Sequence, residues 1–164
     1  TENWQLKGRA GYFFRQLVRT QDTPERYRGF SGGLQALWKQ NERANWEASY
    51  AFDQYDKSEY RRLTKADVRH YSNVQNSLRL VYNLRFGAND VLTLGADYLH
   101  DYLYNKKLEG KTREQNAFDA FAQYDWNILQ NLELVGALRY DYFSDHHFSR
   151  MTPKLVCAMS RSLI

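Results

Sequence analysis

Apolar and polar side chains alternate along most of this chain. Between Trp4 and Phe14 the even positions carry apolar or small residues, whereas the odd positions include Lys7 and Arg9. Alternation over such a length is typical of a β-strand with two unlike faces. The pattern recurs and predicts about eight strands, which cover residues 4–15, 30–38, 46–53, 77–86, 92–98, 118–126, 132–142 and, less regularly, 153–161.

The predicted strands are long, and their connections differ in length between the two sides. Strands of soluble proteins cluster near about 5 or 6 residues, whereas about 9 to 11 tilted residues cross the hydrocarbon of a membrane. Short turns on one side and long polar loops on the other are typical of outer-membrane barrels, with the short side periplasmic. Short turns are expected at residues 40–45, 87–90 and 127–131, and long loops at 20–29, 56–73, 105–116 and 144–151.

Aromatic residues are sorted between the two ends of the predicted strands. Tyrosine and tryptophan suit positions where one part of the side chain is dry and the other wet. The stretch from Trp4 to Phe14 would rise about 25 Å along the membrane normal, which matches the apolar band of a barrel. We therefore expect a membrane girdle of Trp4, Trp38, Trp46 and Trp126 on the short-turn side, and a second one, toward the long loops, that includes Phe14, Phe52 and Tyr140.

These patterns predict an all-β fold, an antiparallel up-and-down meander of about eight long strands that forms a segment of a transmembrane β-barrel wall. The mean hydropathy is −0.76, and no apolar run approaches the about 18 to 20 residues of a spanning helix, so a helical membrane protein is excluded. Two alternatives stay open: a complete small eight-stranded barrel with a structural or adhesive role, and a soluble β-sheet binding module with one wet face.

Charge and cysteine content narrow the function further. The chain has 23 Lys and Arg against 19 Asp and Glu, a net charge of +4, with no basic cluster, so nucleic acid is not an expected partner. Cys157 is the one cysteine, which excludes an internal disulfide and a multi-cysteine metal site.

The polar positions of the strands are expected to face the lumen of the barrel. Opposite charges on neighbouring strands can pair across the ladder, as Arg79 or Arg85 could with Asp97. Two interpretations stay open, namely networks that stabilise a hydrated wall, or contacts to a plug domain or a substrate path. The lumen-facing candidates are Arg79, Arg85, Asp97, Asp119, Arg139 and Asp141.

Histidines and catalytic motifs give weaker signals. His146 and His147 fall in a predicted external loop, and imidazole is a common metal ligand, but two adjacent histidines without further ligands predict no metal site. The chain lacks the nucleophile-elbow, zinc-protease and phosphate-binding glycine motifs. We therefore expect neither enzyme activity nor a cofactor.

The region 134–159, with GALRYD at residues 136–141 and TPKL at residues 152–155, resembles TonB-dependent outer-membrane receptors. In that family a strand with a glycine followed by R-Y-D runs into a loop, and the next strand opens with T-P-K-L. Residues 136–141 (GALRYD) and 152–155 (TPKL) match this arrangement. Residues 90–101 (DVLTLGADYLHD) are similar to the family pattern N-x-L-T-x-G-x-[DE]-Y.

The resemblance implies that residues 1–164 are a single barrel segment with no plug domain and no signal peptide. A full barrel of the family has about 22 strands. The implied location is the outer membrane of a Gram-negative bacterium, where the segment supplies lumen wall and external loops. The implied partners are outer-membrane lipid, the rest of the barrel and its plug, a TonB-type energy-coupling protein acting through the plug, and a bulky nutrient such as a ferric siderophore, haem or cobalamin.

Overall fold

The structure is a computed structural model, which describes residues 3–18, 22–87, 90–129, 132–145 and 147–159. These residues form eight strands, as the alternation predicts. No helix in this part of the chain is long and apolar enough to span a membrane. The strands are β1 Trp4–Leu17, β2 Glu25–Lys39, β3 Ala44–Arg61, β4 Ala66–Phe86, β5 Asp90–Asn105, β6 Thr112–Leu129, β7 Leu132–Phe143 and β8 Phe148–Met159.

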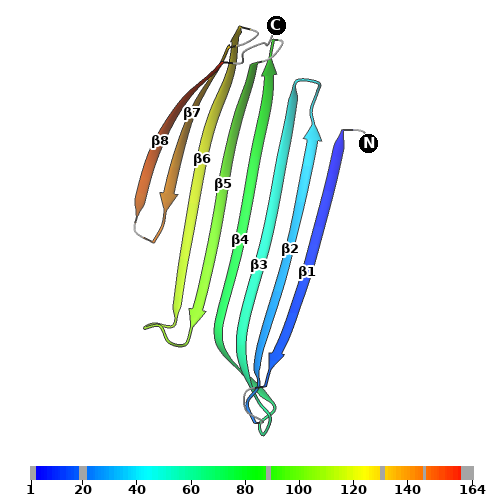
Figure 1. The fold of residues 1–164 in the computed structure, drawn as a ribbon, viewed down its shortest axis with the longest axis vertical. Helices are drawn as coiled ribbons and strands as arrows, with labels where there is room; N and C mark the ends of the chain where they lie inside the picture. Colours follow the sequence, from blue (N-terminus) through cyan, green and yellow to red (C-terminus); the bar gives the residue numbers. More distant parts are fainter. Residues whose placement is uncertain (1–2, 19–21, 88–89, 130–131, 146, 160–164) are drawn as a thin grey trace.

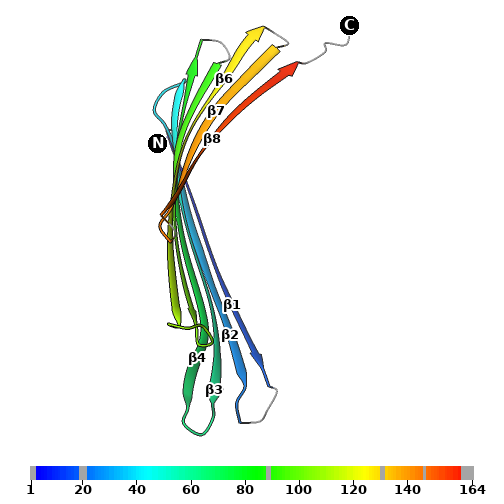
Figure 2. The ribbon, with the colours of Figure 1, turned by 90° about the vertical axis from the view of Figure 1, so that its left-hand side faces the viewer.

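All eight strands belong to one antiparallel sheet, in which each strand pairs with the next in chain order. The predicted up-and-down meander is therefore confirmed. Figure 1 shows the strands side by side, and Figure 2 shows that the described residues form a single curved and twisted layer. Such a layer has no packed core, and the buried apolar residues of the described chain are only Pro24, Ala44, Val81 and Ala117.

The register sorts the side chains onto two unlike faces. Even-numbered residues oppose even-numbered residues through the middle of the sheet, as Leu34 opposes Tyr50. The even-numbered residues of β1 to β7 lie on one face, here called the apolar face. Its apolar side chains are exposed, and Leu34 is 67% exposed. The opposite side is called the polar face. Even-numbered residues of β7 oppose odd-numbered residues of β8, as Gly136 opposes Leu155. The odd-numbered residues of β8 therefore lie on the apolar face.

The long polar loops predicted at residues 20–29, 56–73, 105–116 and 144–151 are wrong in extent. The connections are residues 18–24, 62–65, 106–111 and 144–147, because the strands continue beyond the alternating stretches. Lys57 and Glu25, for example, form an ion pair of 3.2 Å between Nζ and Oε1 across β2 and β3. Where both faces of a strand are wet, the polar–apolar alternation stops although the hydrogen-bonded ladder goes on.

Two predicted boundaries near the end of the chain also differ. β6 runs through Asn127 to Leu129 with a register shift between them, where a turn at 127–131 was expected. β8 begins at Phe148 and not at Pro153, and the predicted residues 160–161 lie outside the described residues. Pro153 lies inside β8, opposite Leu138 of β7, and having no N–H it donates no ladder hydrogen bond there.

Candidate functional site

A row of charged side chains crosses the polar face at one level of the register. Arg79 of β4 opposes Asp97 of β5, which opposes Asp119 of β6. Asp119 in turn opposes Asp141 of β7, which opposes Arg150 of β8. We call these five residues the charged row. Sequence analysis identified four of them and missed Arg150, because the reversed numbering of β8 hides the face on which it lies.

Arg139 holds the carboxylates of the charged row together. Its Nη2 lies 2.9 Å from Oδ2 of Asp119, and its Nε lies 2.5 Å from Oδ1 of Asp141. Like charges at directly opposed strand positions destabilise a sheet, so a cation shared by both carboxylates offsets their repulsion. At the other end of the row, Nε of Arg79 lies 3.6 Å from Oδ1 of Asp97. Of the two pairings considered from the sequence, the structure contains this one.

Two glycines let large side chains lie flat against the polar face. A Cβ atom added at Gly95 would overlap the ring of Phe121 on the neighbouring strand, and one at Gly33 would lie 3.0 Å from Nε of Arg9. The guanidinium of Arg79 lies 5.5 Å from the centre of the Phe121 ring. Glycine at these two positions therefore gives the wall a smooth surface beside the charged row.

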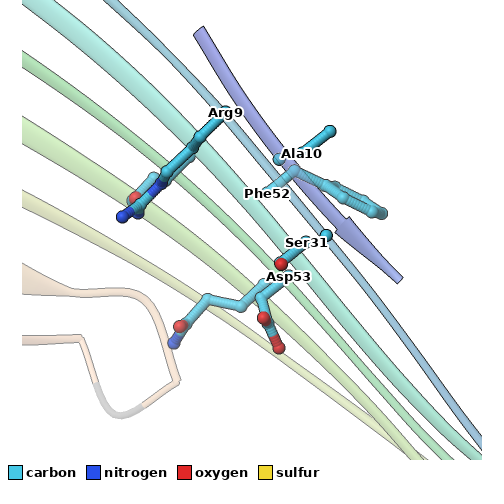
Figure 3. A pocket seen from close by; sticks show the side chains of 10 residues that line it. Arg9, Ala10, Ser31, Phe52 and Asp53 are labelled. Atoms are coloured by element: carbon cyan, nitrogen blue, oxygen red, sulfur yellow. The ribbon is translucent and has the colours of Figure 1, made fainter. Parts of the chain in front are cut away.

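A shallow hollow lies on the polar face across β1 to β4. Its volume is about 470 Å³, and its lining includes Arg9, Gly11, Ser31 and Asp53. Figure 3 shows Arg9 and Asp53 on one side of the sheet, whereas Phe52 projects to the other side. The hollow thus presents a cation, a carboxylate and a hydroxyl around a glycine floor, which suits a polar and hydrated occupant.

The remaining predicted site residues lie apart from the charged row. Arg85 opposes Val91 and lines, together with Lys39, a hollow at the short-turn end of the sheet. His147 lies 3.3 Å from the hydroxyl of Tyr142, measured from its Nδ1, and His146 lies outside the described residues. The described chain contains no group of three or more His, Cys, Asp or Glu that could hold a metal ion.

The predicted girdle residues lie at the two borders of the apolar face. At the short-turn border Trp4 stacks on Trp38 with 5.4 Å between ring centres, and Trp46 packs on Tyr82 at 4.5 Å. At the opposite border the rings of Phe30 and Phe52 are 5.7 Å apart. Trp126, Phe14 and Tyr140 continue these borders and are 46%, 48% and 39% exposed.

The tryptophan border does not follow one register level across the sheet. Cross-strand partners lead from Trp4 through Trp38, Trp46 and further strands to Ala122 of β6. Trp126 lies four residues beyond Ala122, from 122 to 126. The border has therefore moved by four residues over the five steps from β1 to β6.

The opposite aromatic border moves in the same direction. Cross-strand partners lead from Phe14 to Thr112 of β6, and Phe118 lies six residues beyond, from 112 to 118. The two borders together shift by a mean of about one residue per strand. Figure 1 shows that the strand ends step in this direction too, from the β3–β4 hairpin to the β7–β8 hairpin.

Comparison with solved structures gives a likeness of fold. No protein-family model and no curated protein matches the chain. Among solved structures, the siderophore receptor PirA from Pseudomonas aeruginosa is similar over 95% of this chain and 39% of its own, with a TM-score of 0.49 and 15% sequence identity. The chain thus spans 39% of that receptor's length.

Proposed function

We propose that this chain is part of the wall of an outer-membrane β-barrel, in a TonB-dependent receptor that takes up a bulky nutrient. Lipid covers the apolar face, and the polar face lines the lumen. Further strands of the barrel pair with the outer edges of β1 and β8, which have no neighbouring strand among the described residues. The β3–β4 hairpin, which projects furthest, lies on the external side.

The observation that carries this proposal is the slope of the two aromatic borders. Strands lie about 4.8 Å apart and rise about 3.3 Å per residue, so a shift of one residue per strand corresponds to a tilt of about 35°. Strands of membrane barrels tilt by roughly 35–45°. An aromatic border that shifts by about one residue per strand therefore lies at a single depth when the strands tilt by this angle in a membrane. A soluble sheet has no reason to place its aromatic residues along that line.

The width of the apolar band supports the same interpretation. With this tilt, the ten residues from Trp4 to Phe14 span about 27 Å along the normal, close to the about 25 Å band of membrane barrels. Between the borders, leucines follow the same diagonal from β2 to β7. They are Leu34, Leu80, Leu94 and Leu138, each at least 40% exposed.

On the polar face, we assign the charged row and Arg139 to holding neighbouring wall strands together across a hydrated lumen. Arg79 pairs with Asp97 across β4 and β5, and Arg139 pairs with Asp119 across β6 and β7. The proposed cargo is a metal chelate of the ferric siderophore, haem or cobalamin kind. The connections 62–65 and 106–111 are the proposed external loops, and the partner that supplies energy acts through a plug in the lumen.

The depth of the four tryptophans tests the membrane part of this proposal. Four variants, each keeping one tryptophan and carrying phenylalanine at the other three, are folded into phosphatidylcholine vesicles with quenchers at graded depths. We expect the same interfacial depth for Trp4, Trp38, Trp46 and Trp126. Strands that stood upright would put Trp126 about 13 Å away from the level of Trp4, and that result would contradict the proposal.

The transport part is tested in cells. A bacterium whose gene lacks this segment should lose energy-dependent uptake of one labelled nutrient out of ferric siderophore, haem and cobalamin. Dissipating the membrane potential of the parent strain should produce the same loss. Normal uptake of all three nutrients would contradict the proposed transport role but not the proposed membrane location.

A further inference from the structure

Two arginines stand on the apolar face just beyond its external aromatic border. Arg28 of β2 directly opposes Phe14 of β1 and lies two residues beyond Phe30. Arg26 lies two residues further along the same face. We infer that Arg26 and Arg28 form a binding site for the phosphate groups of lipid head groups. This inference rests on the proposed function, because it needs lipid against the apolar face.

The two guanidinium groups are held in place by their neighbours. Nη2 of Arg28 lies 2.7 Å and Nη1 of Arg26 lies 3.2 Å from Oδ2 of Asp67. Arg26 also lies 3.6 Å above the ring centre of Tyr60 and donates from Nε to Oε1 of Gln16 at 3.1 Å. Asp56 directly opposes Arg28 and pairs with Arg69 at 3.7 Å. Three arginines thus face two carboxylates, and the cluster carries a net positive charge on a preorganised frame.

The height of the pair above the aromatic border fits a head-group layer. With the tilt derived from the borders, Arg28 stands about 5 Å and Arg26 about 11 Å beyond the level of Phe30. The polar layer on each side of a bilayer is roughly 5 to 8 Å thick. The backbone of Arg28 therefore lies within the head-group layer and that of Arg26 about 3 Å beyond it. The two guanidinium groups meet at Oδ2 of Asp67.

The chemistry of the pair selects phosphate. A guanidinium donates two parallel hydrogen bonds to a phosphate, and it is weakly hydrated, so it suits a partly dry interface. The side chains of Arg26 and Arg28 are 21% and 35% exposed. Each therefore keeps an accessible side for a ligand, while most of its aliphatic part is covered. Since this face points away from the lumen, its occupant is the surrounding lipid and not the cargo.

The test compares two double substitutions with equal change of charge. Arg26→Gln with Arg28→Gln removes the pair, whereas Arg61→Gln with Arg62→Gln removes two charges from the tip of the adjacent hairpin. Each protein, folded in neutral detergent micelles, is titrated with lipid A, which carries phosphate monoesters, and bound lipid is counted by mass spectrometry of intact complexes. We expect the first variant to bind roughly 30-fold more weakly and the second to stay within about two-fold of the parent.

The outcomes separate the two proposals. Equal binding by all three proteins, or equal loss in both variants, overturns the phosphate site. If millimolar inorganic phosphate displaces all of the bound lipid A, the site binds free anions, and the lipid assignment is overturned too. The same three sequences, within the whole barrel whose further strands pair with the outer edges of β1 and β8, are inserted into pure phosphatidylcholine vesicles, which carry no phosphate monoester. Failure of the parent to insert there overturns the membrane proposal itself.

Discussion

At the scale of single residues, the polar face depends on small residues placed beside large ones. Phe121 can lie flat only because Gly95 opposes it, and the flat ring then supports the guanidinium of Arg79. Alternation predicts that all three side chains share one face, since each has an odd number. It does not predict that they touch, because contact depends on which residue opposes which across the ladder.

A single methyl group tests this packing. Gly95→Ala should lower the free energy of unfolding by about 1–3 kcal/mol, because the added Cβ atom displaces the Phe121 ring. Urea titration in lipid vesicles, followed by tryptophan fluorescence, measures the change. The matched control is Gly136→Ala, where an added Cβ has no atom within 4 Å. Equal effects at the two positions would show that the ring contact is unimportant.

A second residue-scale prediction concerns Arg139. Arg139→Gln leaves Asp119 and Asp141 opposed without their shared cation. We expect a loss of about 1–2 kcal/mol, because the hydrogen bonds are charge-assisted but the guanidinium is half exposed and screened by water. The same urea titration measures the loss. Adding Asp119→Asn to the variant should recover part of it, since the repulsion between the carboxylates disappears, and Arg85→Gln serves as the control.

At the scale of elements, the sequence predicts the existence of the strands better than their ends. In the middle of each strand apolar and polar residues alternate, so this part of the strand is predicted directly from the sequence. The β3–β4 hairpin is polar on both sides, so its strands look like a loop. Bonds such as that of Arg28 to Asp67, at 2.7 Å, connect strands that are not adjacent in the chain, and no periodicity within one strand contains that information.

Acid should loosen this hairpin. Partial burial raises the pKa of Asp67, but hydrogen bonds and charges from Arg28 and Arg26 outweigh burial and hold its pKa below the ordinary 3.8. A lowered carboxyl pKa contributes stability above 3.8, and the contribution is lost as the pH falls below that value through the folded pKa. Backbone hydrogen exchange of β3 and β4, corrected for intrinsic rates, should therefore increase in that window.

The same measurement on a variant isolates the carboxylate. Asp67→Asn should show the faster exchange already at neutral pH and little further change in acid. Glu109→Gln, in the 106–111 connection, removes a carboxylate elsewhere at the same external end and should behave as the parent does. Full protection of the Asp67→Asn hairpin at neutral pH would mean that the ion pairs with Arg26 and Arg28 do not hold it.

At the scale of the whole molecule, the slope of the borders appears only when the register is known. The sequence shows that tryptophans gather at one end of the strands, but a sequence pattern does not give the offset between Trp4 and Trp126. The same reason explains the missed face of β8. There even-numbered residues of β7 oppose odd-numbered residues of β8, so Met151 and Leu155 lie on the apolar face. The alternation of the sequence does not distinguish a segment of a large receptor barrel from a complete eight-stranded barrel. In the described sheet β1 does not pair with β8, so the sheet is not a closed eight-stranded barrel.

Under the proposed function, Leu80 lies at the middle of the membrane, because it lies midway between the two aromatic borders where they cross β4. An arginine on the lipid face costs about 2–4 kcal/mol at the midplane and about 0–1 kcal/mol near the interface. Leu80→Arg should therefore destabilise the protein far more than Phe52→Arg at the external border, as measured by urea unfolding from phosphatidylcholine vesicles. Gln35→Arg, on the polar face, should cost little at any depth. Leu80 is 43% exposed, so on a soluble sheet its replacement would be a surface change within about 0.5 kcal/mol. The depth dependence thus distinguishes a sheet covered by lipid from one covered by water.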